Sequence, residues 1–181
     1  GLWLKYNQKS AISKTEWESL AIASKPKLKG ELFVGVKYGH DGQHVAMSVA
    51  SKTNEGKIFV EALDCRTIRE GNDWILSYIA EMKPKTVVVD GANGQHILEK
   101  DMKDAKMKAP TLPTVKEIIG ANATFEQGLF KGNICHSNQA SLTQSVSNSE
   151  KRAIGSNGGF GYRSLKEGVE IALLDLSLIH I

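Results

Sequence analysis

The stretch Lys85-Thr86-Val87-Val88-Val89-Asp90-Gly91 decides the fold of this 181-residue chain. Three consecutive valines predict a strand that is buried on both faces, and such strands usually lie inside a sheet beside parallel neighbours. The aspartate that follows them stands at the carboxyl end of the strand, where open α/β sheets bind their ligands. Asp90 is therefore the first candidate functional residue. A strand that simply ends in an Asp-Gly turn is the common alternative.

The residues before this strand predict a three-stranded antiparallel meander. Gly39-His40-Asp41-Gly42 has the composition of a tight turn, and Asn54-Glu55-Gly56 provides a second one. The spacing of apolar residues then changes to steps of three and four, which predicts a helix over residues 72–82. The expected strands are apolar and β-branched runs at residues 32–36, 45–50 and 57–63.

The residues after Asp90 predict alternating helices and strands. The order along the chain becomes βββαβαβα, which indicates an α/β protein with an RNase H-like mixed sheet. In that sheet the antiparallel meander is followed by parallel strands, and helices flank both. The further expected elements are helices at 95–106 and 115–127, a short strand at 109–112, a possible strand at 130–136, a possible polar helix at 139–147, a glycine-rich hairpin or loop at 154–162 and a last helix from about residue 168.

Composition limits the protein class without naming a function. The values of 41% hydrophobic and 24% charged residues are ordinary for a globular domain and exclude a disordered or fibrous chain. A net charge of +3 permits contact with a polyanion but does not by itself indicate one. No apolar run reaches the roughly 18 residues of a membrane span, so no membrane association is expected. Cys65 and Cys135 lie outside any metal-ligand spacing, which predicts reduced thiols of an intracellular protein.

The two ends of the chain are expected to differ from its centre. Residues 1–29 predict a linker with a short helix, for which Ser13 is the N-cap and Glu16 stands at the capping-box position. Residues 30–175 form the expected domain. The chain does not begin with methionine, which suggests a fragment of a longer protein. Residues 176–181 are similar to a translated sequencing adapter and are left out of the functional argument, with a buried helix end as the alternative.

Four segments together carry a resemblance to a known family: residues 12–17, residues 34–42, residues 87–91, and residues 151–155 with the glycines that follow them. In this order they resemble the large terminase subunits of tailed phages, in the HK97-like group, over nearly the whole chain. The resemblance implies the C-terminal RNase H-like nuclease domain of such a subunit, with residues 1–29 following the ATPase domain. That ATPase domain is missing from this sequence, because no glycine-rich loop ends in Gly-Lys-Ser/Thr.

The resemblance also implies an activity, partners and a location. The activity is that of a DNA endonuclease, a phosphodiester hydrolase that cuts concatemeric phage DNA during viral genome packaging. The implied partners are double-stranded DNA, the terminase small subunit and the portal protein, in the cytoplasm of the infected bacterial host. Two alternatives stay open: a catalytically weak RNase H-like module for DNA binding or portal docking, and another RNase H-like nuclease such as a resolvase.

The expected cofactors are two Mg²⁺ or Mn²⁺ ions. In an RNase H-like nuclease, carboxylates on adjacent strand ends and on the last helix hold two such ions roughly 4 Å apart. Asp90 is expected to be one catalytic ligand, since hard cations prefer oxygen. The resemblance places Lys37 where most terminase nucleases carry an aspartate, and a lysine repels a metal ion. Asp41, in the following turn, is the candidate substitute as catalytic metal ligand, with a plain hairpin turn as the alternative.

The remaining candidates come from the last third of the chain and from the first strand. Glu170 and Asp175 are the two possible metal ligands of the last helix, and Asp175 is preferred as the catalytic one because it interrupts an apolar run. Lys37 is a candidate contact to the scissile phosphate. Lys151 and Arg152, beside a glycine-rich segment, are candidate contacts to the DNA backbone, with an ordinary solvated patch as the alternative.

Three residues carry weaker expectations. Gly91 is expected to let a substrate backbone approach closely, because it lacks a side chain. His96 and His136 are possible phosphate or metal contacts, although lone histidines are more often ordinary surface residues.

Overall fold

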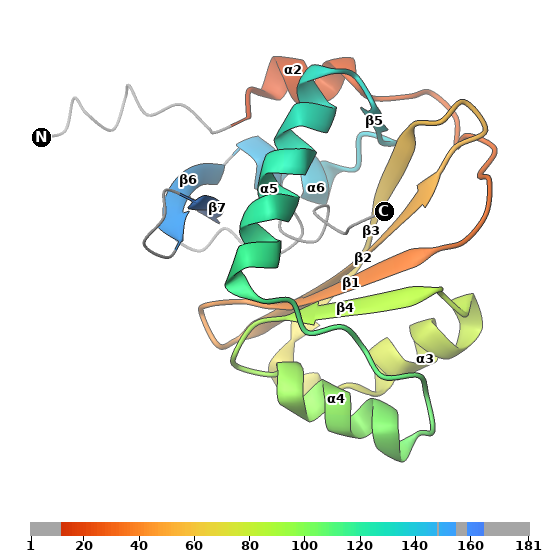
Figure 1. Ribbon diagram of the computed structural model, residues 1–181, viewed down its shortest axis with the longest axis vertical. Coiled ribbons are helices and arrows are strands. Elements are labelled where there is room, and N and C mark those ends of the chain that lie inside the picture. Colours follow the sequence, from red (N-terminus) through yellow and green to blue (C-terminus); the bar gives the residue numbers. More distant parts are fainter. Residues whose placement is uncertain (1–11, 148, 155–158, 165–181) are drawn as a thin grey trace, which may run out of the picture.

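The computed structural model describes residues 12–147, 149–154 and 159–164, and the side chains of residues 12–144. A five-stranded sheet in the order β4-β1-β2-β3-β5 forms the centre of the molecule (Figure 1). β1, β2 and β3 pair antiparallel, β4 is parallel to β1, and β5 is parallel to β3. This confirms the predicted RNase H-like mixed sheet. The strands are β1 (Phe33–Tyr38), β2 (His44–Lys52), β3 (Ile58–Thr67), β4 (Thr86–Asp90) and β5 (Ile134–Cys135).

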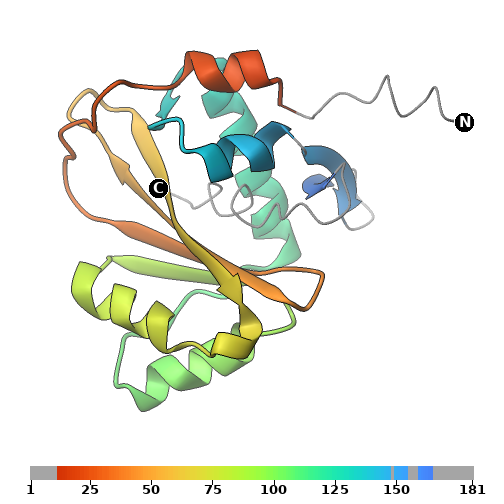
Figure 2. The same cartoon turned by 180° about the vertical axis from the view of Figure 1, so that it is seen from behind.

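Helices cover both faces of this sheet (Figures 1 and 2). α3 and α4 pack on one face, where Val36, Val89 and Leu98 belong to one buried cluster. α2, α5 and α6 lie on the other face, over a second cluster that includes Ala46 and Phe125. The helices are α2 (Lys14–Ser19), α3 (Asp73–Met82), α4 (Gln95–Asp104), α5 (Val115–Phe130) and α6 (Ala140–Ser147), with a short 3-10 turn, η1, at Ile68–Glu70.

The strand expected at 109–112 is reduced to a single bridge. Thr111 pairs with Val88 in parallel, and its N–H donates to the carbonyl of Val87 at 2.8 Å. Pro110 and Pro113 flank Thr111, and a proline has no N–H to give to a ladder. The prediction of a full strand was therefore wrong, although the chain does pass beside β4 at the expected place.

β3 is longer than its apolar pattern predicted. The predicted run ended at residue 63, whereas the strand continues to Thr67, which pairs with His44 at the start of β2. An irregularity between Met47 and Ser48 interrupts this ladder, and the pairing resumes beyond it. The extension carries Asp64 and Arg66, whose side chains form an ion pair at 2.8 Å.

The segment around α2 packs onto the domain. The Ser13 side chain accepts from the N–H of Glu16 at 3.0 Å, as the predicted N-cap requires. Trp17 is fully buried and stacks on the ring of His136 with centroids 3.8 Å apart. The N–H of Ile22 donates to the carbonyl of His136 at 2.8 Å. The segment that carries α2, predicted as a linker with a short helix, therefore contributes Ile12 and Trp17 to the core.

A two-stranded antiparallel hairpin follows α6. It consists of β6 (Ser149–Ile154) and β7 (Gly159–Ser164) and lies beside α5 (Figure 1). The glycine-rich hairpin predicted near residues 154–162 is thus confirmed, with its first strand beginning earlier than expected. The helix expected from about residue 168 lies outside the described residues.

Candidate functional site

The carboxyl ends of β1 and β4 bring Lys37 and Asp90 together. These two residues are in register across the parallel pair, so their side chains leave the same face of the sheet. The Lys37 ammonium contacts Oδ2 of Asp90 in an ion pair. The Lys37 side chain is 9% exposed and that of Asp90 is 26% exposed, so the cation is the more deeply buried partner. We call this pair and its two strand ends the carboxyl edge.

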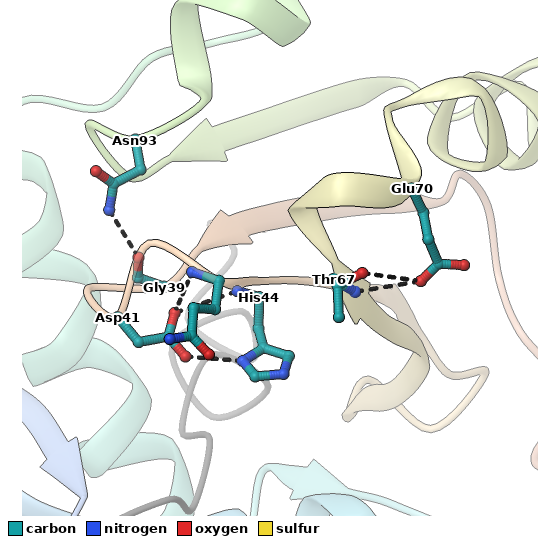
Figure 3. Close-up of polar contacts among 7 residues, drawn as sticks. Gly39, Asp41, His44, Thr67, Glu70 and Asn93 are labelled. Carbon is teal, nitrogen blue, oxygen red and sulfur yellow. Dashed lines mark hydrogen bonds and ion pairs between the residues drawn. The ribbon is translucent and has the colours of Figure 1, made fainter.

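The loop after Asp90 closes tightly on β1. Gly91 has a φ of +108°, and a Cβ at this position would overlap with the carbonyl oxygen of Tyr38. A Cβ at Gly94 would overlap with the Tyr38 ring. Asn93 donates from Nδ2 to the carbonyl of Gly39 at 2.9 Å (Figure 3). The close approach that glycine permits at position 91 is therefore to the protein's own Tyr38.

Tyr38 anchors the other side of this loop through a chain of hydrogen bonds. Its hydroxyl donates to Oδ1 of Asn72 at 2.7 Å, and Asn72 donates from Nδ2 to Oδ2 of Asp101 at 2.8 Å. Burial, reinforced by the negative charge of Asp101, raises the pKa of Tyr38 above its ordinary range. The hydroxyl is therefore a permanent donor at neutral pH. This network fixes the end of β1 against α3 and α4, and with it the position of Lys37.

Asp41 lies in the β1–β2 turn, and both of its carboxylate oxygens contact neighbouring residues of the turn (Figure 3). Oδ1 accepts from the N–H groups of Gln43 and His44 at 2.8 and 3.2 Å, and Oδ2 contacts Nδ1 of His44 at 2.7 Å. Partial burial works to raise the pKa of Asp41, but the hydrogen bonds from the His44 ring and from both N–H groups outweigh it and lower the pKa. These contacts are those of the plain hairpin turn, and they give no support to Asp41 as a metal ligand.

The side chains of the other predicted site residues are outside the range 12–144 for which the structure describes side chains. Lys151 and Arg152 belong to β6, where they pair with Tyr162 and Gly161 of β7. Glu170 and Asp175 lie outside the described residues. Within residues 12–144, no group of three or more His, Cys, Asp or Glu side chains is arranged to hold a metal ion.

The side chains described at the carboxyl edge provide few oxygen donors for a metal ion. It offers one carboxylate, Asp90, and that carboxylate already contacts an ammonium. A site for two divalent ions needs several oxygen ligands and a negative surplus of charge. The side chains described at this edge therefore do not fit a two-metal centre.

His136 and His96, the two histidines considered as phosphate or metal contacts, both contact other groups of the protein. His136 is fully buried, and its Nε2 lies 2.7 Å from the carbonyl oxygen of Trp17, while Nδ1 accepts from the N–H of Asn138 at 2.9 Å. These partners fix the neutral tautomer with the proton on Nε2. His96 lies on the surface of α4, 3.6 Å from Glu99. Neither arrangement resembles a metal or phosphate site, and the role of His136 in packing was not visible from its local sequence.

Comparisons with known proteins locate the fold. No family model and no curated protein matches the sequence. The large terminase of bacteriophage HK97 matches with a TM-score of 0.70 at 15% identity, over 93% of this chain and 42% of that one. The large terminase nuclease of the thermophilic phage G20c matches with a TM-score of 0.65 at 15% identity, over 95% and 97% of the two chains.

A third match extends the comparison to a further phage. The nuclease domain of the large terminase subunit gp2 of bacterial virus Sf6 gives a TM-score of 0.60 at 14% identity, over 93% of this chain and 96% of that one. Related structures of the G20c nuclease and of a mutant Sf6 nuclease domain contain magnesium and manganese, respectively. The chain thus spans less than half of the HK97 terminase and nearly all of each isolated nuclease domain. It has the fold of the nuclease domain of phage large terminases.

Proposed function

We propose that this chain is the DNA-cutting nuclease domain of a phage genome-packaging terminase. The observation that carries the proposal is the position of Asp90, at the carboxyl end of β4, the edge strand that pairs in parallel with β1. Its side chain remains 26% exposed, so an incoming phosphodiester can reach it. The match over nearly the full length of two isolated terminase nucleases supports the same assignment.

Basic residues provide the proposed contacts to DNA. Lys37 carries its ammonium at the carboxyl edge, beside Asp90, and a phosphate oxygen is a natural second acceptor for it. Lys151 and Arg152 lie on the hairpin next to α5 and are proposed contacts to the DNA backbone. Such contacts position DNA without reading its sequence, which suits a largely nonspecific nuclease.

The proposed DNA cleavage includes dependence on a divalent metal ion. Terminase nucleases of the same fold have been seen with magnesium or manganese. Asp90 is the carboxylate described at the carboxyl edge, and Glu170 or Asp175 is the proposed source of further oxygen ligands. The proposed partners are double-stranded DNA, the terminase small subunit and the portal protein, in the cytoplasm of the infected host.

A plasmid-cleavage assay tests the enzyme. The 181-residue chain is incubated with supercoiled plasmid and Mn²⁺, next to Asp90→Asn and a double variant, Lys37→Met with Asp90→Asn, that leaves the edge without charge. Nicking or linearisation by the parent that both variants lose supports the nuclease. Cleavage that persists undiminished in both variants would mean that Asp90 is not part of the active site.

The ion pair itself favours a second candidate function, a catalytically weak module that binds DNA or docks on the portal. A carboxylate neutralised by an ammonium is a poor metal ligand, whereas a basic surface still binds phosphates. An absence of cleavage by the parent, with DNA binding retained in a salt-dependent gel shift, would favour this module over the enzyme.

A further inference from the structure

We infer that the Lys37 ammonium takes the place of a divalent cation beside Asp90, so that the carboxyl edge contains a built-in monovalent cation. The inference rests on the proposed function only in taking this edge as the site. It departs from the expected two-metal chemistry, and the departure follows from the described side chains themselves.

Lys37 and Asp90 occupy directly paired positions on adjacent parallel strands. Neighbouring strands lie roughly 4.8 Å apart, so two carboxylates in these positions would both reach a cation placed between them. In this chain the space between the two strand ends is instead filled by the Lys37 ammonium, which contacts Oδ2 of Asp90.

The pair has no net charge, whereas two carboxylates in the same positions would carry a charge of minus two before any ion binds. With 9% of its side chain exposed, Lys37 is screened little by solvent. A divalent ion that approached Asp90 would therefore meet a fixed positive charge and would have to displace it from the Asp90 carboxylate.

The strand end that carries the Lys37 ammonium is firmly held. Tyr38, the next residue along β1, is locked by Asn72 and by the glycines of the β4–α4 loop. Buried charges persist in proteins when they are paired, and breaking such a pair is strongly unfavourable. The strand end that carries Lys37 is thus held in place on its other face, which keeps the ammonium at the edge.

The consequence for metal binding can be measured without any enzymatic readout. Mn²⁺ is titrated into the 181-residue chain while the electron paramagnetic resonance signal of free Mn²⁺ is recorded. The reference is the double variant Lys37→Met with Asp90→Asn, whose edge has neither charge. We expect the parent and this reference to take up Mn²⁺ equally.

A second measurement asks whether a carboxylate at position 37 creates a metal site. In Lys37→Asp, the edge acquires a second carboxylate, and we expect one additional Mn²⁺ bound at least roughly tenfold more tightly than any ion at this edge of the parent. Lys37→Asp combined with Asp90→Asn is the matched control and should lose most of that gain. Lys37→Asn, which supplies a neutral oxygen, provides a milder variant if the two carboxylates prevent folding, and circular dichroism checks each variant.

Two results would overturn the inference. One is stoichiometric Mn²⁺ binding by the parent that the uncharged double variant lacks, since the ammonium would then be displaced by metal. The other is a folded Lys37→Asp or Lys37→Asn chain with no additional Mn²⁺. The plasmid assay reports separately on the proposed function: a parent that cuts DNA through Asp90 and binds Mn²⁺ there sustains the nuclease and refutes the inference.

Discussion

Replacing Asp90 by asparagine should destabilise the domain more than replacing Lys37 by methionine, because the two substitutions leave opposite charges in unequal surroundings. Asp90→Asn removes the carboxylate that the ammonium of Lys37 contacts, on a side chain that is 9% exposed. Removing one partner of a buried ion pair typically costs about 3–5 kcal/mol of unfolding free energy. Lys37→Met keeps most of the apolar stem and strands a carboxylate that is 26% exposed, for which we expect about 1–2 kcal/mol.

The double variant separates this explanation from a loss of packing. With both charges of the pair removed, neither is left without the other, and the unfolding free energy should return to within about 1 kcal/mol of the parent. Urea denaturation followed by circular dichroism gives all four values, and the thermodynamic cycle should show a coupling of at least about 3 kcal/mol. A double variant as unstable as Asp90→Asn alone would refute the reasoning, because the cost would then not come from the stranded charge.

Three further predictions concern the surroundings of the site. Trp17→Ala should lower the unfolding free energy by about 3–5 kcal/mol in urea denaturation, because the ring is fully buried against His136; a cost below about 1 kcal/mol would show that α2 is not integral to the fold. Burial lowers the pKa of His136 despite its hydrogen bond to the Trp17 carbonyl, so its contribution to stability is present above the unfolded pKa of about 6.5 and is lost as the pH falls below it. Urea titrations between pH 7 and 5 should therefore show falling stability, and His136→Gln should flatten that dependence. Gly91→Ala should lower the free energy of unfolding by at least about 1 kcal/mol in thermal melts, since an alanine there combines a positive φ with a clash against the Tyr38 carbonyl. The control is Gly120→Ala, which should not destabilise the domain because its added Cβ meets nothing within 4 Å.

The fold could be predicted where the hydrophobic pattern is local and uninterrupted. The valines before Asp90 form a strand parallel to β1, as they predict. That strand lies at the edge of the five-stranded sheet and Val88 is only half-buried, so the prediction of a strand inside the sheet and buried on both faces was wrong. The pattern failed where pairing depends on distant partners. The polar end of β3 gives no strand signal of its own, yet it pairs with the start of β2, and Arg66 at that end lies over the ring of Trp74.

The candidate site shows the same division. The sequence identifies Asp90 and the unusual Lys37, but only the parallel register of β1 and β4 shows that they form a pair. The turn chemistry around Asp41 allowed either a ligand or a cap, and the hydrogen bonds to Gln43 and His44 favour the cap. The burial of His136 could not be foreseen because its stacking partner, Trp17, lies 119 residues away.

The two faces of β1 explain how this fold can persist while the charges of its site change. Val34 and Val36 point into the cluster under α3 and α4, where Val87 and Val89 of β4 meet them. Since side chains alternate along a strand, Lys37 belongs to the opposite face and takes no part in that apolar cluster. The register that aligns Lys37 with Asp90 is thus set by the valines and not by the ion pair. An exchange of charge at position 37 should therefore alter cation binding while leaving the sheet intact, which is why the fold alone, shared at 15% identity with known terminase nucleases, does not determine the metal chemistry.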